Sequence, residues 1–153
     1  MVTKRNQKIA GVLVGLAIPM VILFFVFSAA FPVVTGTVAS KGTSLGTWSS
    51  KVNDCNSALP AELGADFDFP LPDAAPWHLA LDGRSGGASE LFLWKQGTAP
   101  TKLSAKNCAS FNVSYESDNA KINGKRGKQG TVTFDCATEG GQFTGAFSYE
   151  NCR

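Results

Sequence analysis

Two features of this chain could support acid–base or nucleophilic chemistry: its single histidine, His78, and the pentapeptide Gly42-Thr43-Ser44-Leu45-Gly46. The pentapeptide matches the G-x-S-x-G elbow of serine hydrolases, where the serine occupies a turn between a strand and a helix. No helical pattern follows Ser44, and no spacing links His78 to a nucleophile. The sequence therefore predicts a domain without catalytic residues or a cofactor, and a small envelope hydrolase is the alternative.

Four acids could offer oxygen ligands to Ca²⁺, namely Asp66, Asp68, Asp73 and Asp82. The calcium loop of an EF-hand requires a fixed pattern over about 12 residues, and these acids do not follow it. We interpret them as solvated side chains beside prolines, and we expect no metal site.

The four cysteines, Cys55, Cys108, Cys136 and Cys152, follow one another at separations of 53, 28 and 16 residues. Zinc ligands usually come in close pairs such as C-x-x-C, and no such pair occurs here. An even number of cysteines in a small exported domain is typical of a disulfide framework. The sequence therefore predicts two disulfides.

The pairing of these cysteines depends on how often the chain reverses. Strands at 111–116, 120–123, 131–136 and 143–150 would form an up-and-down meander with three reversals. Cys108 would then lie at the same end as Cys152, and Cys136 at the opposite end. This arrangement favours Cys108–Cys152 and Cys55–Cys136, although four cysteines allow three pairings and spacing alone does not choose between them.

An apolar segment occupies residues 9–34, which carry no charge and are preceded by Lys4, Arg5 and Lys8. As a helix, these 26 residues would extend about 39 Å, more than the hydrocarbon core of about 30 Å requires. Lys and Arg beside a span tend to stay in the cytoplasm. We expect residues 1–8 in the cytoplasm, a signal-anchor helix at 9–34 in the bilayer, and the remainder outside.

Two further interpretations concern the same segment. Ser28 and Ala30 have the small side chains that precede a signal-peptide cleavage site, so a cleaved, secreted domain is the alternative to an anchor. Gly11 and Gly15 form a G-x-x-x-G motif, which lets two helices approach closely and would support a homodimer. Glycine is also simply frequent in membrane helices, which explains the motif without a dimer.

The rest of the chain shows the period of two that indicates β-strands. Apolar residues alternate with polar ones around Trp77–Asp82, Phe111–Glu116 and Thr131–Cys136, and glycine-containing turn signals separate the runs. The pattern predicts an all-β fold: one small antiparallel sandwich or open barrel over residues 51–153. Residues 35–50, which are rich in Gly, Ser and Thr, would form a stalk or an edge strand.

Charge is unevenly distributed along this part of the chain. Residues 54–90 hold seven acids and one base, whereas residues 95–128 hold seven bases and two acids. Four of the bases surround the turn signal Asn123-Gly124: Lys121, Lys125, Arg126 and Lys128. They could contact an anionic surface or polymer, or simply keep a hairpin tip solvated. We expect no nucleic-acid partner, because no aromatic residue interleaves them.

Trp48, Trp77 and Trp94 offer either core packing or a stacking surface for sugars. The sequence as a whole predicts a single-pass membrane protein that presents a small, non-catalytic β domain for binding or a structural role. Its partner would be an unidentified envelope protein or polymer. The alternative is a secreted β domain that binds a glycan or an anionic polymer.

Overall fold

The computed structural model describes residues 31–42, 45–57, 63–83, 89–122, 125–138 and 141–153. Residues 1–31 and 32–153 form separate units, and every described strand belongs to the second. Its elements are β1 (Val33–Gly42), β2 (Trp48–Lys51), β3 (Phe67–Pro70), the 3-10 turn η2 (Pro72–Ala74), β4 (His78–Asp82), β5 (Glu90–Trp94), β6 (Thr101–Leu103), β7 (Cys108–Val113), β8 (Glu116–Ile122), β9 (Lys125–Thr138) and β10 (Gly141–Cys152).

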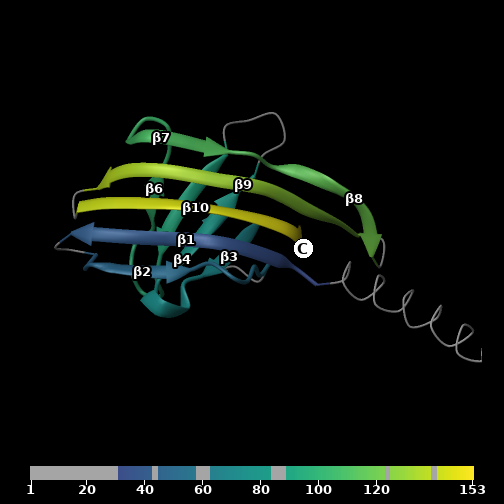
Figure 1. Ribbon diagram of the computed structural model, residues 1–153, viewed down its shortest axis with the longest axis horizontal. Helices are drawn as coiled ribbons and strands as arrows, with labels where there is room; N and C mark the ends of the chain where they lie inside the picture. Colours follow the sequence, from purple (N-terminus) through teal and green to yellow (C-terminus); the bar gives the residue numbers. More distant parts are fainter. Residues whose placement is uncertain (1–30, 43–44, 58–62, 84–88, 123–124, 139–140) are drawn as a thin grey trace, which may run out of the picture. The chain divides into compact units, whose positions relative to one another are not determined.

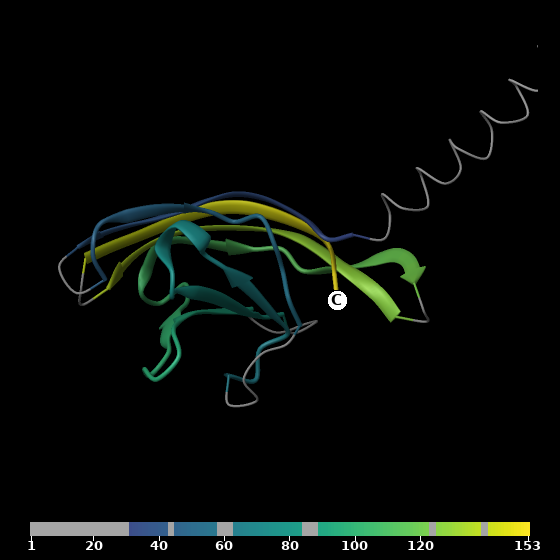
Figure 2. The same cartoon turned by 90° about the horizontal axis from the view of Figure 1, so that it is seen from below.

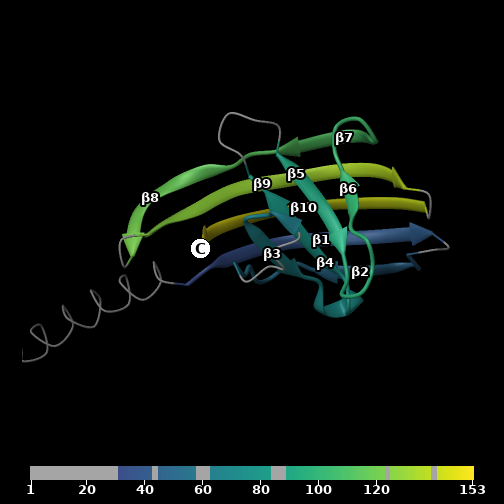
Figure 3. The same ribbon diagram turned by 180° about the vertical axis from the view of Figure 1, so that it is seen from behind.

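The strands form two antiparallel sheets. In the first sheet the order is β2-β1-β10-β9-β7, and β8 also pairs with β9. In the second sheet the order is β3-β4-β5-β6. The long strands of the first sheet lie in front of the second sheet in Figure 1; in Figure 3, the view from behind, the second sheet lies in front and its strands cross them. The predicted all-β, antiparallel architecture is confirmed.

The core lies between the two sheets, which Figure 2 shows as two layers. The expected alternation holds: Leu79 and Leu81 of β4 are buried, as are Phe143 and Phe147 of β10. Phe69 of the second sheet joins the layers, because its ring centroid lies 5.0 Å from that of Phe147 and 5.5 Å from that of Tyr149. Burial of these large apolar side chains is the main stabilising contribution to the fold.

The start of the domain differs from the prediction. Val33 and Val34 were expected at the end of a helix, but they pair with Glu150 and Tyr149 in the first sheet. Residues 35–50 are not a stalk. Of the two strands in this stretch, β1 is an interior strand between β2 and β10, and β2 is an edge strand. The Thr and Val residues of this stretch favour strands, and alternate residues such as Val34 and Val38 are buried in the core.

Among the residues that the structure describes, no helix is long and apolar enough to cross a membrane. Most of the predicted span at 9–34, with the proposed dimer face at Gly11 and Gly15, lies outside the described residues.

β7 and β8 run in the same direction and pair with successive parts of the same strand, β9. β7 pairs with β9 up to Val113 and Val132, and β8 continues the pairing from Glu116 and Gln129. The two residues between them form a break in one long edge, not a reversal. The chain from Cys108 to Cys152 therefore reverses twice, not three times.

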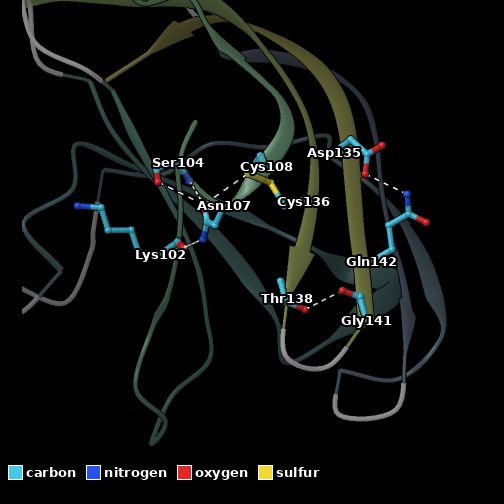
Figure 4. The surroundings of a disulfide bond; sticks show 9 residues. All are labelled: Lys102, Ser104, Asn107, Cys108, Asp135, Cys136, Thr138, Gly141 and Gln142. Atoms are coloured by element: carbon cyan, nitrogen blue, oxygen red, sulfur yellow. Dashed lines mark hydrogen bonds between the residues drawn. A yellow bond between two sulfur atoms is a disulfide. The ribbon is translucent and has the colours of Figure 1, made fainter.

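The predicted disulfide pairing is wrong for this reason. The structure joins Cys108 to Cys136 and Cys55 to Cys152, and no described cysteine is free. With two reversals Cys108 and Cys136 lie directly opposite each other on β7 and β9, as Figure 4 shows. Cys55, which precedes β3, is joined to the end of β10, so this disulfide links the second sheet to the first.

The chain's two tyrosines, Tyr115 and Tyr149, lie where the break in the edge meets the core. Tyr149 donates its hydroxyl hydrogen to the carbonyl of Ser114 at 3.1 Å, and Tyr115 donates to Oδ2 of Asp66 at 3.0 Å. Burial raises the pKa of both phenols well above the ordinary value of 10.0, and the charge of Asp66 raises both further.

We expect no tyrosinate absorbance from the native protein when the pH passes through 10. The folded pKa values lie above the unfolded value, so their contribution to stability is fully present below pH 10 and declines as the pH rises further. Ultraviolet absorbance during an alkaline titration, read beside circular dichroism, checks this. Tyrosinate that forms near pH 10 while the circular dichroism stays native would contradict it.

Candidate functional site

A carboxylate, an imidazole and an indole meet on the outer face of the second sheet. Asp68 of β3, His78 of β4 and Trp94 of β5 come from three neighbouring strands. Oδ2 of Asp68 lies 2.8 Å from Nδ1 of His78, and Oδ1 accepts a hydrogen bond from Nε1 of Trp94 at 3.2 Å. The two rings stack, with centroids 4.7 Å apart and planes tilted by 32°. Each oxygen of the Asp68 carboxylate thus makes a hydrogen bond to a different aromatic ring.

Strand register produces this cluster. Within β3 and β4, Phe67, Phe69, Leu79 and Leu81 point into the core, so the residues between them point outward. His78 lies directly opposite both Pro70 and Trp94. Asp68 lies two residues from Pro70, which makes it the diagonal neighbour of His78.

The carboxylate of Asp68 is almost fully buried, with 7% of its side chain exposed against 31% for His78. The segment before β3 lies alongside it: Asn56 exchanges two backbone hydrogen bonds with Asp68, at 2.7 and 2.8 Å. Burial raises the pKa of Asp68, although its bonds to His78 and Trp94 oppose the shift. A buried carboxylate is unfavourable unless its oxygens are satisfied, and here the satisfying groups are the two partly exposed rings.

A hollow of about 310 Å³ lies beside Trp94. Its lining is Leu63, Trp94, Lys95, Gln96, Gly97, Thr98 and Pro100. Lys95 also lies over the ring of Trp77, with Nζ 4.7 Å from the ring centroid. An indole held in a fixed orientation therefore stands next to a hollow that is bordered by amide, hydroxyl and ammonium groups.

Two kinds of chemistry are compatible with this cluster. The fixed indole offers a flat stacking surface at low entropic cost, which suits binding. The Asp68–His78 pair also has the geometry of a base and its orienting carboxylate, with Nε2 as the ring nitrogen left to face a ligand. The side chain of His78 contacts Asp68 and Trp94, neither of which has a hydroxyl or thiol that the imidazole could activate as a nucleophile. The cluster thus supplies a binding surface more completely than a catalytic one.

Comparisons of the chain with protein-family models, with curated proteins and with solved structures gave no match. A function for this chain must therefore be inferred from the arrangement of its own side chains.

Three of the acids considered as calcium ligands, Asp66, Asp68 and Asp73, serve as hydrogen-bond acceptors within the protein. Asp66 accepts from Tyr115 and from the backbone N–H of Gly83 at 3.1 Å, and Asp73 accepts from the N–H of Lys51 at 3.2 Å. Asp82 is buried. Within the described ranges, no group of three or more His, Cys, Asp or Glu side chains is placed to hold a metal ion.

The three tryptophans have different surroundings. The indole of Trp48 donates to the carbonyl of Leu45 at 2.8 Å and packs edge-on against Phe143 at 5.8 Å. Trp77 packs against the core, and the ammonium group of Lys95 lies over its ring. Trp94 combines a place beside a hollow with an orientation fixed by Asp68.

The G-x-S-x-G pentapeptide lies between two antiparallel strands. Gly42 ends β1, and Leu45 and Gly46 precede β2; Thr43 and Ser44 lie outside the described residues. A hairpin connection does not supply the strand-to-helix elbow that the hydrolase motif requires.

A wider cleft of about 560 Å³ lies where β6 and β7, an edge strand of each sheet, come near each other. Its walls include Phe111, Asn112 and Val113 of β7, together with Lys102 and Glu90, which form an ion pair. Because this pair neutralises its own charges, the cleft presents a mixed rather than a strongly charged surface.

The four basic residues belong to β8 and β9, which pair as a hairpin. Lys121 pairs with Arg126 in the backbone register of β8 and β9, and Ile122 pairs with Lys125. Arg126 is exposed, while Lys128 bonds to Oγ of Ser117 at 2.9 Å and lies over the ring of Tyr115 at 4.9 Å.

Sequence reasoning missed the Asp68–His78–Trp94 cluster. Nine residues, three of them prolines, lie between Asp68 and His78, and nothing in that spacing fixes a register. The usable signal was the period of two, which puts His78 and Trp94 on the face opposite the buried leucines.

Proposed function

We propose that this chain is a single-pass membrane protein that presents a disulfide-linked, two-sheet β domain outside the cytoplasm, where the domain binds a ligand. The observation that carries the proposal is the pair of disulfides, which together use all four cysteines of the chain. Disulfides form and persist in oxidising compartments and are rare in the cytosol. The uncharged run at 9–34 behind three cations supplies the means of export and a tether.

Thiol labelling of the full-length chain tests this proposal. In intact cells treated with a protease that does not cross the membrane, the β domain should be digested. A maleimide should label its cysteines only after denaturation and reduction. Labelling of all four thiols without reduction would overturn the proposal.

The mass of the mature N-terminus separates the anchored protein from the secreted one: a chain that starts at Phe31 is secreted, and one that retains residues 9–30 is anchored.

Trp94 supports a second, more specific proposal, that the ligand is a glycan. Its indole orientation is fixed by Asp68 and His78, and the adjoining hollow is bordered by the polar side chains of Gln96 and Thr98. Sugars present apolar C–H faces that pack on aromatic rings and hydroxyl groups that require polar partners. Binding sites of this kind combine an aromatic wall with a few placed polar groups.

Replacing Trp94 by Ala should weaken binding at least about fivefold, because truncation of a tryptophan that anchors a ligand costs more than about 1 kcal/mol. Asp68→Asn should weaken binding less, since it loosens the ring without removing it. Calorimetry with a panel of neutral oligosaccharides measures both effects. Trp48→Phe, which changes a tryptophan distant from the hollow, is the matched control. Equal affinities for Trp94→Ala and the parent would exclude this site.

A further inference from the structure

The register of the first sheet brings three features to one end of the domain. Val33, where the chain enters β1, pairs with Glu150 near the end of β10. Cys152 at the end of β10 pairs with Lys128 of β9. The connection between β8 and β9 lies farther along β9 in the same direction. Figures 1 and 3 show the start of β1, the end of β10 and the end of β8 on the same side.

The β8–β9 hairpin reaches beyond the point where the chain enters the domain. Tyr149 pairs with Gly130, and β9 extends from there for five more residues to Lys125, whereas β1 begins only one pair beyond Tyr149. The hairpin thus exceeds β1 by about four residues, or about 14 Å of strand. Figure 2 shows it continuing past the end of the second sheet.

The residues at this end suit a lipid surface. The large hydrophobic residues exposed within the described ranges are Phe31 and Val33, at 60% and 47%, and both lie at the entry of the chain. The extension carries four cations, Lys121, Lys125, Arg126 and Lys128, and two acids, Asp118 and Glu116, the latter at its base opposite Gln129. Apolar residues next to a cluster of cations are the composition of segments that rest at a bilayer interface.

We propose that the β8–β9 hairpin rests on the anionic headgroups of the same bilayer that holds the apolar N-terminal segment. This inference depends on the membrane tether proposed above. The chain must leave the domain at Val33, so a span that ends near residue 30 leaves only a few residues between the bilayer and β1. A basic extension of this length would be able to cross that short distance and bring its cations to the headgroups.

Electrostatic attraction is sufficient for this contact. A Lys or Arg near an anionic bilayer adds about 1 kcal/mol, or about fivefold in binding, and the effect disappears beyond a Debye length of about 8 Å at physiological salt. A tether of only a few residues would keep the hairpin within that range. Docking would fix the orientation of the domain on the bilayer. The face that holds Trp94 belongs to the second sheet and is separate from the hairpin that contacts lipid.

Hydrogen exchange on the full-length chain in lipid nanodiscs tests the proposal. In discs that contain phosphatidylglycerol, amides of residues 116–130 should exchange at least about tenfold more slowly than in phosphatidylcholine discs. The protection should disappear in 1 M salt, where the Debye length falls to about 3 Å. Substituting Gln at Lys121, Lys125, Arg126 and Lys128 together should abolish it. Substituting Gln at Lys41, Lys51, Lys95 and Lys106 removes the same charge elsewhere and should leave it intact.

The experiment distinguishes a failure of the docking proposal from a failure of the tether. If the chain stays in the discs but the hairpin exchanges equally in both lipids, the tether stands and the docking proposal is wrong. If the chain does not associate with the discs at all, the tether and the docking fail together. Protection that appears only when soluble polyphosphate is added would assign the hairpin to an anionic envelope polymer and would also overturn the proposal.

Discussion

Replacing Cys55 and Cys152 together by Ala is expected to lower the free energy of unfolding by about 4–5 kcal/mol. The disulfide closes a loop with a sequence separation of 97, for which the chain-entropy model gives about 4.7 kcal/mol. It also holds the segment that contains Asn56 against β3. We therefore expect the double variant to loosen the Asp68–Trp94 contact in the native state, which increases the mobility of the indole. Guanidinium unfolding without reductant measures stability, and tryptophan anisotropy reports on the ring.

The matched control is the pair Cys108→Ala and Cys136→Ala. Its loop has a separation of only 28, which corresponds to about 3.5 kcal/mol. It joins two strands that already pair in register, so anisotropy should not change. A larger loss of stability from this control than from the first pair would show that the inter-sheet disulfide does not have the role assigned to it.

Phe69→Ala is expected to cost about 3–5 kcal/mol, the usual range for deletion of a fully buried phenylalanine ring. Phe69 has no exposed surface, and its ring contacts Phe147 and Tyr149 of the opposite sheet. The variant should leave a cavity between the layers, because residues anchored on two paired sheets cannot collapse into it. Denaturant unfolding gives the difference in free energy.

Phe92→Ala is the comparison for Phe69→Ala. Phe92 is an aromatic residue in the middle of a strand of the same sheet, but it lies on the outer face and is only partly buried. We expect its removal to cost clearly less than that of Phe69. Similar losses for both variants would contradict the assignment of the core to the space between the sheets.

The strands were predictable because a period of two directly reports which side of a strand faces the core. Val132, Phe134 and Cys136 alternate in the sequence and are buried in the structure. The number of reversals was not predictable from the same signal. The chain between Val113 and Glu116 interrupts the ladder without turning back, and alternation does not distinguish a break from a turn. One miscounted reversal was enough to exchange the disulfide partners.

The candidate site was less accessible to sequence reasoning than the fold. Asp68 resembled a solvated acid beside prolines, yet it is buried, and a backbone bridge joins it to Asn56. That bridge depends on a segment held by Cys55, whose partner lies 97 residues away. Contacts at such separations follow from tertiary structure, whereas the grouping of the four basic residues was local and could be predicted.

The position of β10 has a consequence for biosynthesis. β10 lies between β1 and β9, so the first sheet is incomplete until this late-made strand pairs with one made near the beginning. At a translation rate of about 5–20 residues per second, Cys55 waits about 5–20 s for Cys152 to be made, while Cys108 and Cys136 emerge earlier. During that interval mispaired sulfurs are a kinetic hazard, and a disulfide isomerase should raise the yield of the native domain more than it raises the rate of thiol oxidation.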